Sequence, residues 1–262
     1  MYTRMTLSIV LLILLSSFAR AEWRFEGETR VVYNSNLSNS DRSADVRDDW
    51  AWRSDIGAGN GLQLTRDVRL NFGADLRGEV WDRFGAFSTI GPGASAGLRY
   101  RFGLGRQAPW VLLEDRFGYD RFQDTAQSGY DNVLNFQAGI ALSDRIALEG
   151  GYAFESFVAP DNFYDRQVHR GNASILFDVT SSLQVTVGYI YREGDVISYA
   201  VPPRPDIARF SMLGRTHAFS FSVAYQLTKY ASVQLGYEYA ITTHDPLQYE
   251  NHLVEANIAV AY

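Results

Sequence analysis

Apolar and polar residues alternate with a period of two along most of the chain after residue 22. Between residues 68 and 80 the apolar positions are Val68, Leu70, Phe72, Ala74, Leu76 and Val80, and the polar ones are Arg69, Asn71, Asp75, Arg77 and Glu79. Successive side chains of a β-strand point to opposite faces, so this pattern predicts strands with one apolar and one polar face.

Twelve segments of this kind follow one another. They lie at about 23–34, 48–63, 68–81, 93–104, 109–120, 131–142, 146–157, 169–179, 183–193, 215–226, 231–242 and 252–262. The segment 109–120 is the least regular, because Asp115 interrupts its apolar face. Five short turns alternate with six longer polar loops, at 35–47, 82–92, 121–130, 158–168, 194–214 and 243–251. Eleven connections are the number that twelve consecutive strands require.

The lengths of these elements favour a membrane barrel over a secreted soluble sandwich or propeller. Strands of soluble sheets are typically about 5–6 residues long, whereas a strand that crosses a bilayer needs roughly 9–11. Short turns at one end and long loops at the other are typical of outer-membrane barrels. The pattern therefore predicts an all-β protein: an antiparallel up-and-down transmembrane β-barrel of twelve strands, with short periplasmic turns and longer external loops.

Aromatic residues gather near the predicted strand ends, where amphipathic rings prefer the membrane interface. The predicted interface residues are Trp23, Trp110, Tyr225 and Tyr262 at the short-turn rim and Tyr33, Trp50, Trp52, Tyr191 and Tyr239 at the long-loop rim.

The first 21 residues have the features of a cleaved secretory signal peptide. Arg4 precedes the apolar run Met5–Phe18, and Ala19 and Ala21 supply the small residues of a cleavage site. This run of fourteen residues is too short for a transmembrane helix, which needs about 20. We expect residues 1–21 to be removed and residues 22–262 to form the barrel.

The last strand ends in a pattern of its own. Val254, Ala256, Ile258, Val260 and Tyr262 lie on one face of the terminal segment. Together with the predicted signal peptide, this ending resembles Gram-negative outer-membrane β-barrel proteins, whose C-terminal signature is recognised by the barrel-assembly machinery. The resemblance implies an outer-membrane location, in contact with lipid and lipopolysaccharide. The strand count resembles the twelve-stranded members, which include oligosaccharide-specific porins, although here acidic residues are mixed among the arginines.

Charged residues occupy the polar face of the predicted strands and would line a lumen. The arginines on this face are Arg24, Arg30, Arg53, Arg69, Arg77, Arg99, Arg101, Arg116, Arg170 and Arg192, and the acids nearest to them in the pattern are Asp75, Glu79 and Glu114. Strands near the C-terminus carry mainly neutral polar residues on this face. One interpretation is a channel whose charged wall orients hydrated solutes; the other is that the charges neutralise one another and close the barrel.

Composition excludes several other classes of protein. The chain has no cysteine, and its 24 basic against 30 acidic residues argue against a nucleic-acid partner. The four histidines show no metal-ligand spacing, and no serine–histidine couple stands out, so neither a cofactor, a metal nor an enzyme is predicted.

Three hypotheses remain. The first is a passive narrow channel for small hydrophilic solutes. The second is a closed barrel that acts through its external loops, associated with the envelope or with an exopolysaccharide. The third, and the weakest, is an outer-membrane acyl hydrolase. The loop 194–214 could fold inward as a constriction or form a solvated external loop.

Overall fold

The computed structural model describes residues 23–199, 208–245 and 247–262. The predicted signal peptide and the proline-containing tip of the predicted loop 194–214 lie outside these residues.

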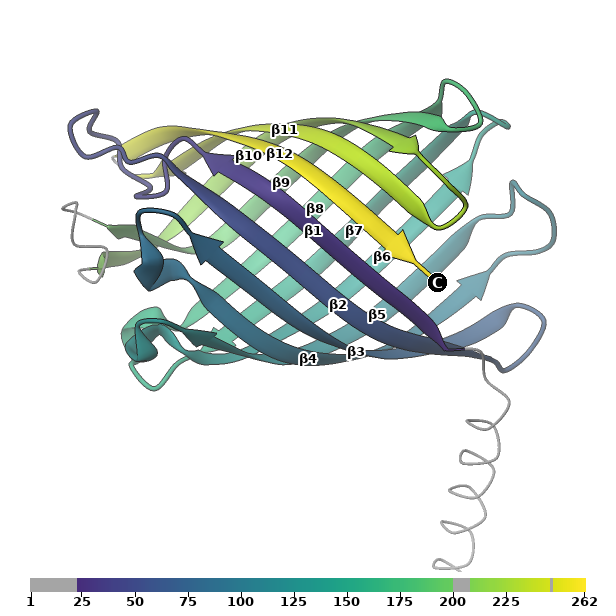
Figure 1. Ribbon diagram of the computed structural model, residues 1–262, viewed down its shortest axis with the longest axis horizontal. Coiled ribbons are helices and arrows are strands. Elements are labelled where there is room, and N and C mark those ends of the chain that lie inside the picture. The colour runs from purple at the N-terminus through teal and green to yellow at the C-terminus, as the bar shows by residue number, and fades with distance from the viewer. Residues whose placement is uncertain (1–22, 200–207, 246) are drawn as a thin grey trace, which may run out of the picture.

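The described chain forms twelve antiparallel strands (Figure 1). They are β1 (Arg24–Asn34), β2 (Asp49–Gln63), β3 (Val68–Trp81), β4 (Thr89–Arg101), β5 (Trp110–Phe122), β6 (Gly129–Ala141), β7 (Ile146–Val158), β8 (Arg166–Asp178), β9 (Leu183–Tyr199), β10 (Ala208–Gln226), β11 (Ala231–His244) and β12 (Leu247–Ala261). Each strand pairs with the next, and β1 pairs with β12 from Glu26 opposite Ala261 to Asn34 opposite Leu253. The predicted twelve-stranded up-and-down barrel is therefore confirmed.

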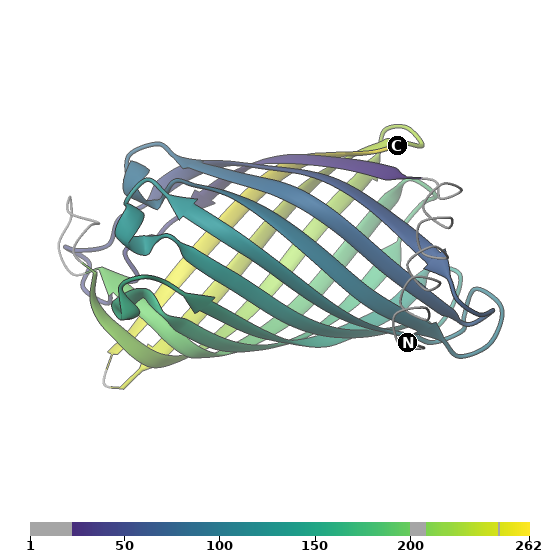
Figure 2. The ribbon, with the colours of Figure 1, turned by 90° about the horizontal axis from the view of Figure 1, so that it is seen from below.

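Closure of the sheet satisfies the backbone. A sheet edge in hydrocarbon would leave peptide groups without hydrogen-bond partners, and a barrel has no edge. The strands tilt strongly across the wall in both views of the ribbon (Figures 1 and 2), as closure of a barrel requires.

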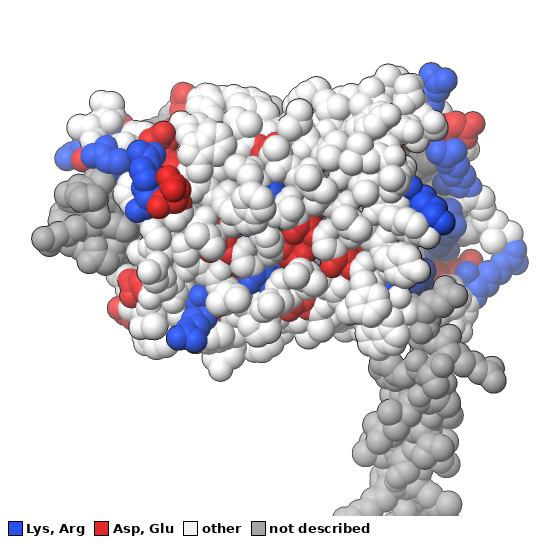
Figure 3. Space-filling view, viewed as in Figure 1, with Lys and Arg blue, Asp and Glu red and all other residues white. Residues whose placement is uncertain are grey.

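The apolar face of the strands points outward. Ile56 and Leu235 are each 66% exposed, and Val80 is 63% exposed, on the outer wall. Figure 3 shows an outer wall that is mostly uncharged, with Arg, Lys, Asp and Glu side chains at both rims and a smaller group of charged atoms near the middle. This arrangement suits a protein that is solvated by lipid around its waist and by water at both ends. No helix among the described residues has the length and apolar character needed to cross a bilayer.

The predicted bounds of two long loops are wrong, because the neighbouring strands are longer than expected. Within the segment predicted as loop 194–214, residues 194–199 belong to β9, which runs to Tyr199, and residues 208–214 belong to β10, which begins at Ala208. The predicted loop 243–251 shrinks in the same way, since β11 ends at His244 and β12 begins at Leu247. The extensions of β11 and β12 are mostly polar, and those of β9 and β10 mix adjacent apolar residues such as Val196 and Ile197 with polar ones, so neither shows the regular alternation that predicts a strand.

Three further loops are shorter than predicted and share one design. A single turn of 3₁₀ helix lies in each: η1 (Gly85–Phe87), η2 (Thr125–Gln127) and η3 (Asn162–Tyr164). Asp124 and Asp161 cap the second and third turns by accepting from the backbone amides of Ala126 and Phe163. These compact turns define the long-loop rim next to the charged part of the lumen.

Candidate functional site: the charged lumen

The strand register turns every predicted lumen residue inward. Positions that alternate with the exposed apolar residues carry Arg53, Arg69, Asp75, Arg77, Glu79, Arg99, Arg101, Glu114, Arg116 and Arg192. The structure brings some of these together and leaves others apart.

Five of the charged side chains form one cluster on the wall made by β3, β5 and β6. The Arg116 guanidinium lies 2.6 Å from Asp75 and 2.7 Å from Asp131. Arg77 reaches both Asp120 and Asp131 at 3.2 Å. The side chains of Arg116 and Asp131 are only 16% and 12% exposed, so their attraction is weakly screened by water. With three carboxylates and two guanidinium groups, the cluster carries one net negative charge.

Strand β4 makes the cluster possible because its inward positions beside the cluster, from Gly91 to Gly97, carry no side chain larger than that of serine. Arg116 lies on β5 and Asp75 on β3, so their contact must cross the strand between them. Gly93 occupies the crossing point, and a Cβ there would overlap the guanidinium of Arg116. A Cβ at Gly118 would likewise overlap the carboxylate of Asp131.

The cluster lies between two cavities in the lumen. The larger, of about 740 Å³, faces the short-turn end and is lined by Arg69, Arg99, Glu114, Arg116 and Asp75, among others. The smaller, of about 230 Å³, includes Arg77 and Asp120 together with Arg53 and Glu79. Glu28 and Asp55 line both cavities. A solute that passed along the lumen would meet the cluster between them.

Most other lumen arginines pair locally. Arg53 lies 2.5 Å from Glu79 and over the ring of Trp81, and Arg192 lies 3.5 Å from Glu238. Inward positions of β9 to β12 are mainly neutral, among them Thr186, Ser220, Ser222, Gln234 and Asn257. The lumen therefore has a charged half and a neutral polar half, as the sequence predicts.

The long-loop mouth is crossed by two segments. Beyond Gly194, β9 pairs only with β10, and its Ile197 turns into an apolar cluster with Phe157, Ala159 and Tyr164. From the other side, the amide of Asn39 in the first loop donates to the Ile197 carbonyl oxygen at 3.0 Å. The outer ends of β9 and β10 thus lie over the mouth rather than continuing the wall.

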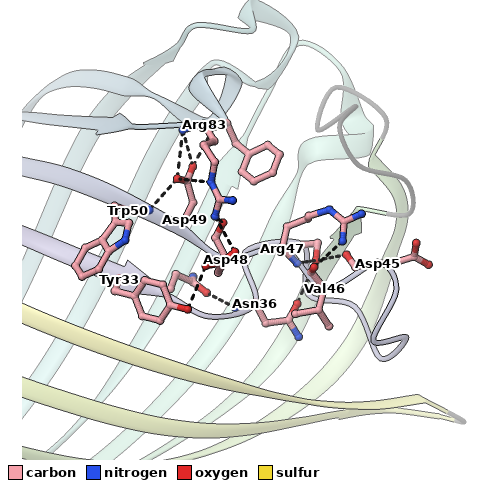
Figure 4. A network of polar contacts seen from close by, with 12 residues as sticks. Tyr33, Asn36, Asp45, Val46, Arg47, Asp48, Asp49, Trp50 and Arg83 are labelled. Atoms are coloured by element: carbon pink, nitrogen blue, oxygen red, sulfur yellow. Dashed lines mark hydrogen bonds and ion pairs between the residues drawn. The ribbon is translucent and has the colours of Figure 1, made fainter.

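A second network anchors the first loop to the loop after β3 (Figure 4). Asp49, which is fully buried, accepts hydrogen bonds from the backbone amides of Trp50 at 2.8 Å and Phe84 at 3.0 Å. Arg83 donates to the Asp48 carboxylate at 2.7 Å, and this hydrogen bond holds the pKa of Asp48 below its ordinary value. The carboxylates of Asp48 and Asp49 therefore hold the two loops together. The described residues contain no group of three or more potential metal ligands.

The predicted interface aromatics lie on the outer wall with one exception. Trp23, Trp50, Trp52, Tyr225 and Tyr262 are exposed there, Tyr33 packs on Trp50, and Tyr191 and Tyr239 contact outward histidines. The prediction for Trp110 is wrong. Its register places the side chain inside, with the Arg99 guanidinium 4.5 Å from its ring centroid and Gly139 against the indole. The terminal residues Val254, Ala256, Ile258, Val260 and Tyr262 share the outer face.

The outward histidines have tyrosine partners. His169, His217 and His252 each place Nδ1 2.6 to 2.8 Å from the hydroxyl of Tyr152, Tyr189 and Tyr237, respectively. In each pair the phenol therefore bonds Nδ1, the ring nitrogen that an acid contacts in a catalytic triad, and leaves Nε2 to other contacts.

Asp120 and Asp131 were not identified from the sequence. Asp120 is the last residue of the predicted strand 109–120 and Asp131 is the first residue of the predicted strand 131–142. The alternation of inward and outward positions could have identified them as lumen residues. Asp120 lies on the same face of its strand as Arg116, and Asp131 lies on the same face as Asn135 and Gln137.

Asp115, by contrast, interrupts the lipid-facing wall. It points outward near the middle of β5 and accepts a hydrogen bond from Asn132 at 2.7 Å. Carboxylates on the lipid face of a barrel are unfavourable. Replacing Asp115 and Asn132 together with leucine should raise the free energy of unfolding in lipid by about 1 to 2 kcal/mol. Denaturant titration would measure this, with Asp144→Leu in a water-exposed turn as the control that gains nothing.

Comparison with solved structures places the fold among barrels of the bacterial outer membrane. The COG4313 outer membrane channel from Pseudomonas putida F1 superposes with a TM-score of 0.66 at 10% identity, covering 91% of this chain and 95% of that one. The NanC porin gives 0.52 at 10% identity, with 89% and 98% covered. The CymD monoaromatic hydrocarbon channel gives 0.50 at 8% identity, with 92% and 88% covered. No protein-family model and no curated protein matches the sequence. The resemblance to outer-membrane barrels is thus confirmed for the fold.

Proposed function

We propose that the protein is an outer-membrane barrel that acts as a passive, narrow channel for small hydrophilic solutes. The observation that carries this proposal is the pair of charged cavities along the lumen, separated by the cluster of Arg77, Arg116, Asp75, Asp120 and Asp131. Water-filled cavities lined by both signs of charge stabilise hydrated polar solutes and repel apolar ones. The shared fold of outer-membrane channels supports the same proposal.

The test is conductance of the refolded protein in planar lipid bilayers. We expect small discrete current steps, and Arg77→Ala should shift the reversal potential toward cation selectivity, because it removes a positive charge from the wall. Protein that inserts in the folded form and never carries current would contradict the channel.

One observation favours a second candidate, a closed barrel that binds an envelope component through its loops. Asn39 joins the first loop to β9 at Ile197, so two external segments that lie far apart in the sequence are held together at the mouth. In that case, deletion of 194–214 would abolish binding to the cell surface component and leave the conductance at zero. Current through the intact protein would decide against this candidate.

A further inference from the structure

Two inward side chains of opposite charge lie on neighbouring strands and do not pair with each other. Arg99 of β4 and Glu114 of β5 both line the 740 Å³ cavity. Glu114 is directly opposite Gly97, so Arg99 is its diagonal neighbour in the strand register. Long side chains at diagonal positions are within reach of each other. Nevertheless, neither of the two has an oppositely charged group of any described residue within 4.0 Å.

The side chain of Glu114 leans toward β4. A Cβ on Gly97 would lie 3.2 Å from the Glu114 Cβ and 3.3 Å from its Cγ, so this side chain passes over the bare backbone of β4. The next inward residue along β5 is Arg116, which is already shared by two carboxylates at 2.6 and 2.7 Å. On the other side, Glu114 lies opposite Asn135 of β6, which is neutral. The charge of Glu114 is therefore available to a ligand in the cavity.

Trp110 holds Arg99 away from Glu114. Arg99 lies opposite Leu112 and has two diagonal neighbours on β5, Trp110 on one side and Glu114 on the other. Its guanidinium group stacks on Trp110, with 4.5 Å between Cζ and the ring centroid. Stacking on an aromatic ring fixes a guanidinium group and leaves its N–H groups able to bind an anion. The inward position of Trp110 thus separates two charges that the register brings together.

The cavity around this pair has no excess of either charge, because five basic and five acidic side chains line it. An ion of a single sign is attracted by half of these groups and repelled by the other half. Such an ion would also leave either Arg99 or Glu114 without a partner. A small molecule that carries both charges can pair with both side chains at once.

We propose that Arg99 and Glu114 form a binding site for a zwitterionic solute, a small molecule with an anionic and a cationic group on one short chain. The Arg99 guanidinium donates charge-assisted hydrogen bonds to the carboxylate of the solute, and the ammonium group of the solute donates to the Glu114 carboxylate. Trp110 is a positioning residue, because it acts through Arg99. The site deepens the proposed channel by naming a class of solute, and it rests on that function only in requiring that the cavity be open to water.

Calorimetric titration of the folded protein in a nonionic detergent tests the site. The probe is 4-aminobutyrate, and the comparisons at the same ionic strength are butyrate and butylammonium, which each carry one of its two charges. The wild type should bind 4-aminobutyrate about tenfold more tightly than either comparison. Arg99→Gln should reduce this affinity to that for butylammonium, and Glu114→Gln should reduce it to that for butyrate. Arg170→Gln is the matched control with wild-type affinity, since it removes an arginine that pairs with Glu155 and does not line this cavity.

A further variant leaves both charges in place. Trp110→Leu removes the ring on which Arg99 stacks, so Arg99 can turn to its other diagonal neighbour and pair with Glu114. This ion pair should close the site and weaken binding of 4-aminobutyrate about tenfold. Trp110→Phe keeps an aromatic ring at this position and should retain most of the wild-type affinity.

Two results would overturn the site: folded wild-type protein that binds 4-aminobutyrate no more tightly than butyrate and butylammonium, or equal losses of affinity in Arg99→Gln and Arg170→Gln. An unchanged affinity in Trp110→Leu would overturn the positioning role of Trp110. Binding without conductance would contradict only the channel, and conductance without binding would contradict only this site.

Discussion

Replacing Arg116 with alanine is expected to lower the free energy of unfolding by about 3 kcal/mol. Arg116 lies between Asp75 and Asp131 at 2.6 and 2.7 Å, and all three side chains are largely buried. Its removal leaves two carboxylates close together without a cation between them. The same change takes the net charge of the cluster from minus one to minus two, so the lumen should also become more selective for cations.

Denaturant titration and reversal potentials measure the two effects separately. Arg170→Ala is the control: Arg170 has one partner, Glu155, at 3.2 Å in a more exposed position, so little stability should be lost. Equal losses in the two variants would show that the Arg116 cluster is no more than an ordinary ion pair.

Replacing Gly194 with valine is expected to open the long-loop mouth and to increase single-channel conductance severalfold. Gly194 has a φ of +155°, and a Cβ there would overlap the backbone of Gln167 and Val168. This glycine lies at the last pair between β8 and β9, where the outer end of β9 turns over the mouth. A branched residue cannot adopt that geometry without strain, so Ile197 should leave its contacts with Phe157 and Tyr164.

Gly171→Val provides the matched control for this experiment. Gly171 lies on the adjacent strand, and nothing lies within 4 Å of the position that its Cβ would take. Its conductance should equal that of the wild type. An unchanged conductance in folded Gly194→Val would mean that the β9–β10 hairpin does not limit the current.

The alternation of residues predicts the fold well because a membrane wall imposes it on every strand. Lipid strongly favours apolar side chains, so the alternating positions of residues such as Leu76 and Leu235 identify the outer face without tertiary information. The alternation of apolar and polar residues is less strict where the strands extend beyond the membrane. It therefore does not predict the strand extensions to Tyr199 and from Leu247, where contacts such as that of Ile197 with Phe157 replace the contact with lipid.

The candidate site could be predicted only in part, because the alternation along a strand shows which face a residue occupies but not which residue it contacts. The alternation predicts that Arg116 and Asp75 point inward. Their ion pair across β4 depends on the missing side chain of Gly93, and the sequence pattern does not reveal this dependence. Trp110 was misassigned because an aromatic residue at a strand end fits the interface as well as the lumen. Its contact with Arg99 becomes visible only in the register of β4 and β5.

The central claim is that the apolar face of the wall meets lipid and the polar face encloses water, and cysteine labelling along β4 tests it directly. The chain has no cysteine, so single substitutions at Ala94, Ser95 and Ala96 each introduce one unique thiol. In lipid vesicles, Ser95→Cys should react with a charged, water-soluble maleimide, whereas Ala94→Cys and Ala96→Cys should react only with a lipid-soluble one. Fast reaction of both alanine positions with the charged reagent, with Ser95→Cys protected, would contradict this orientation of the wall.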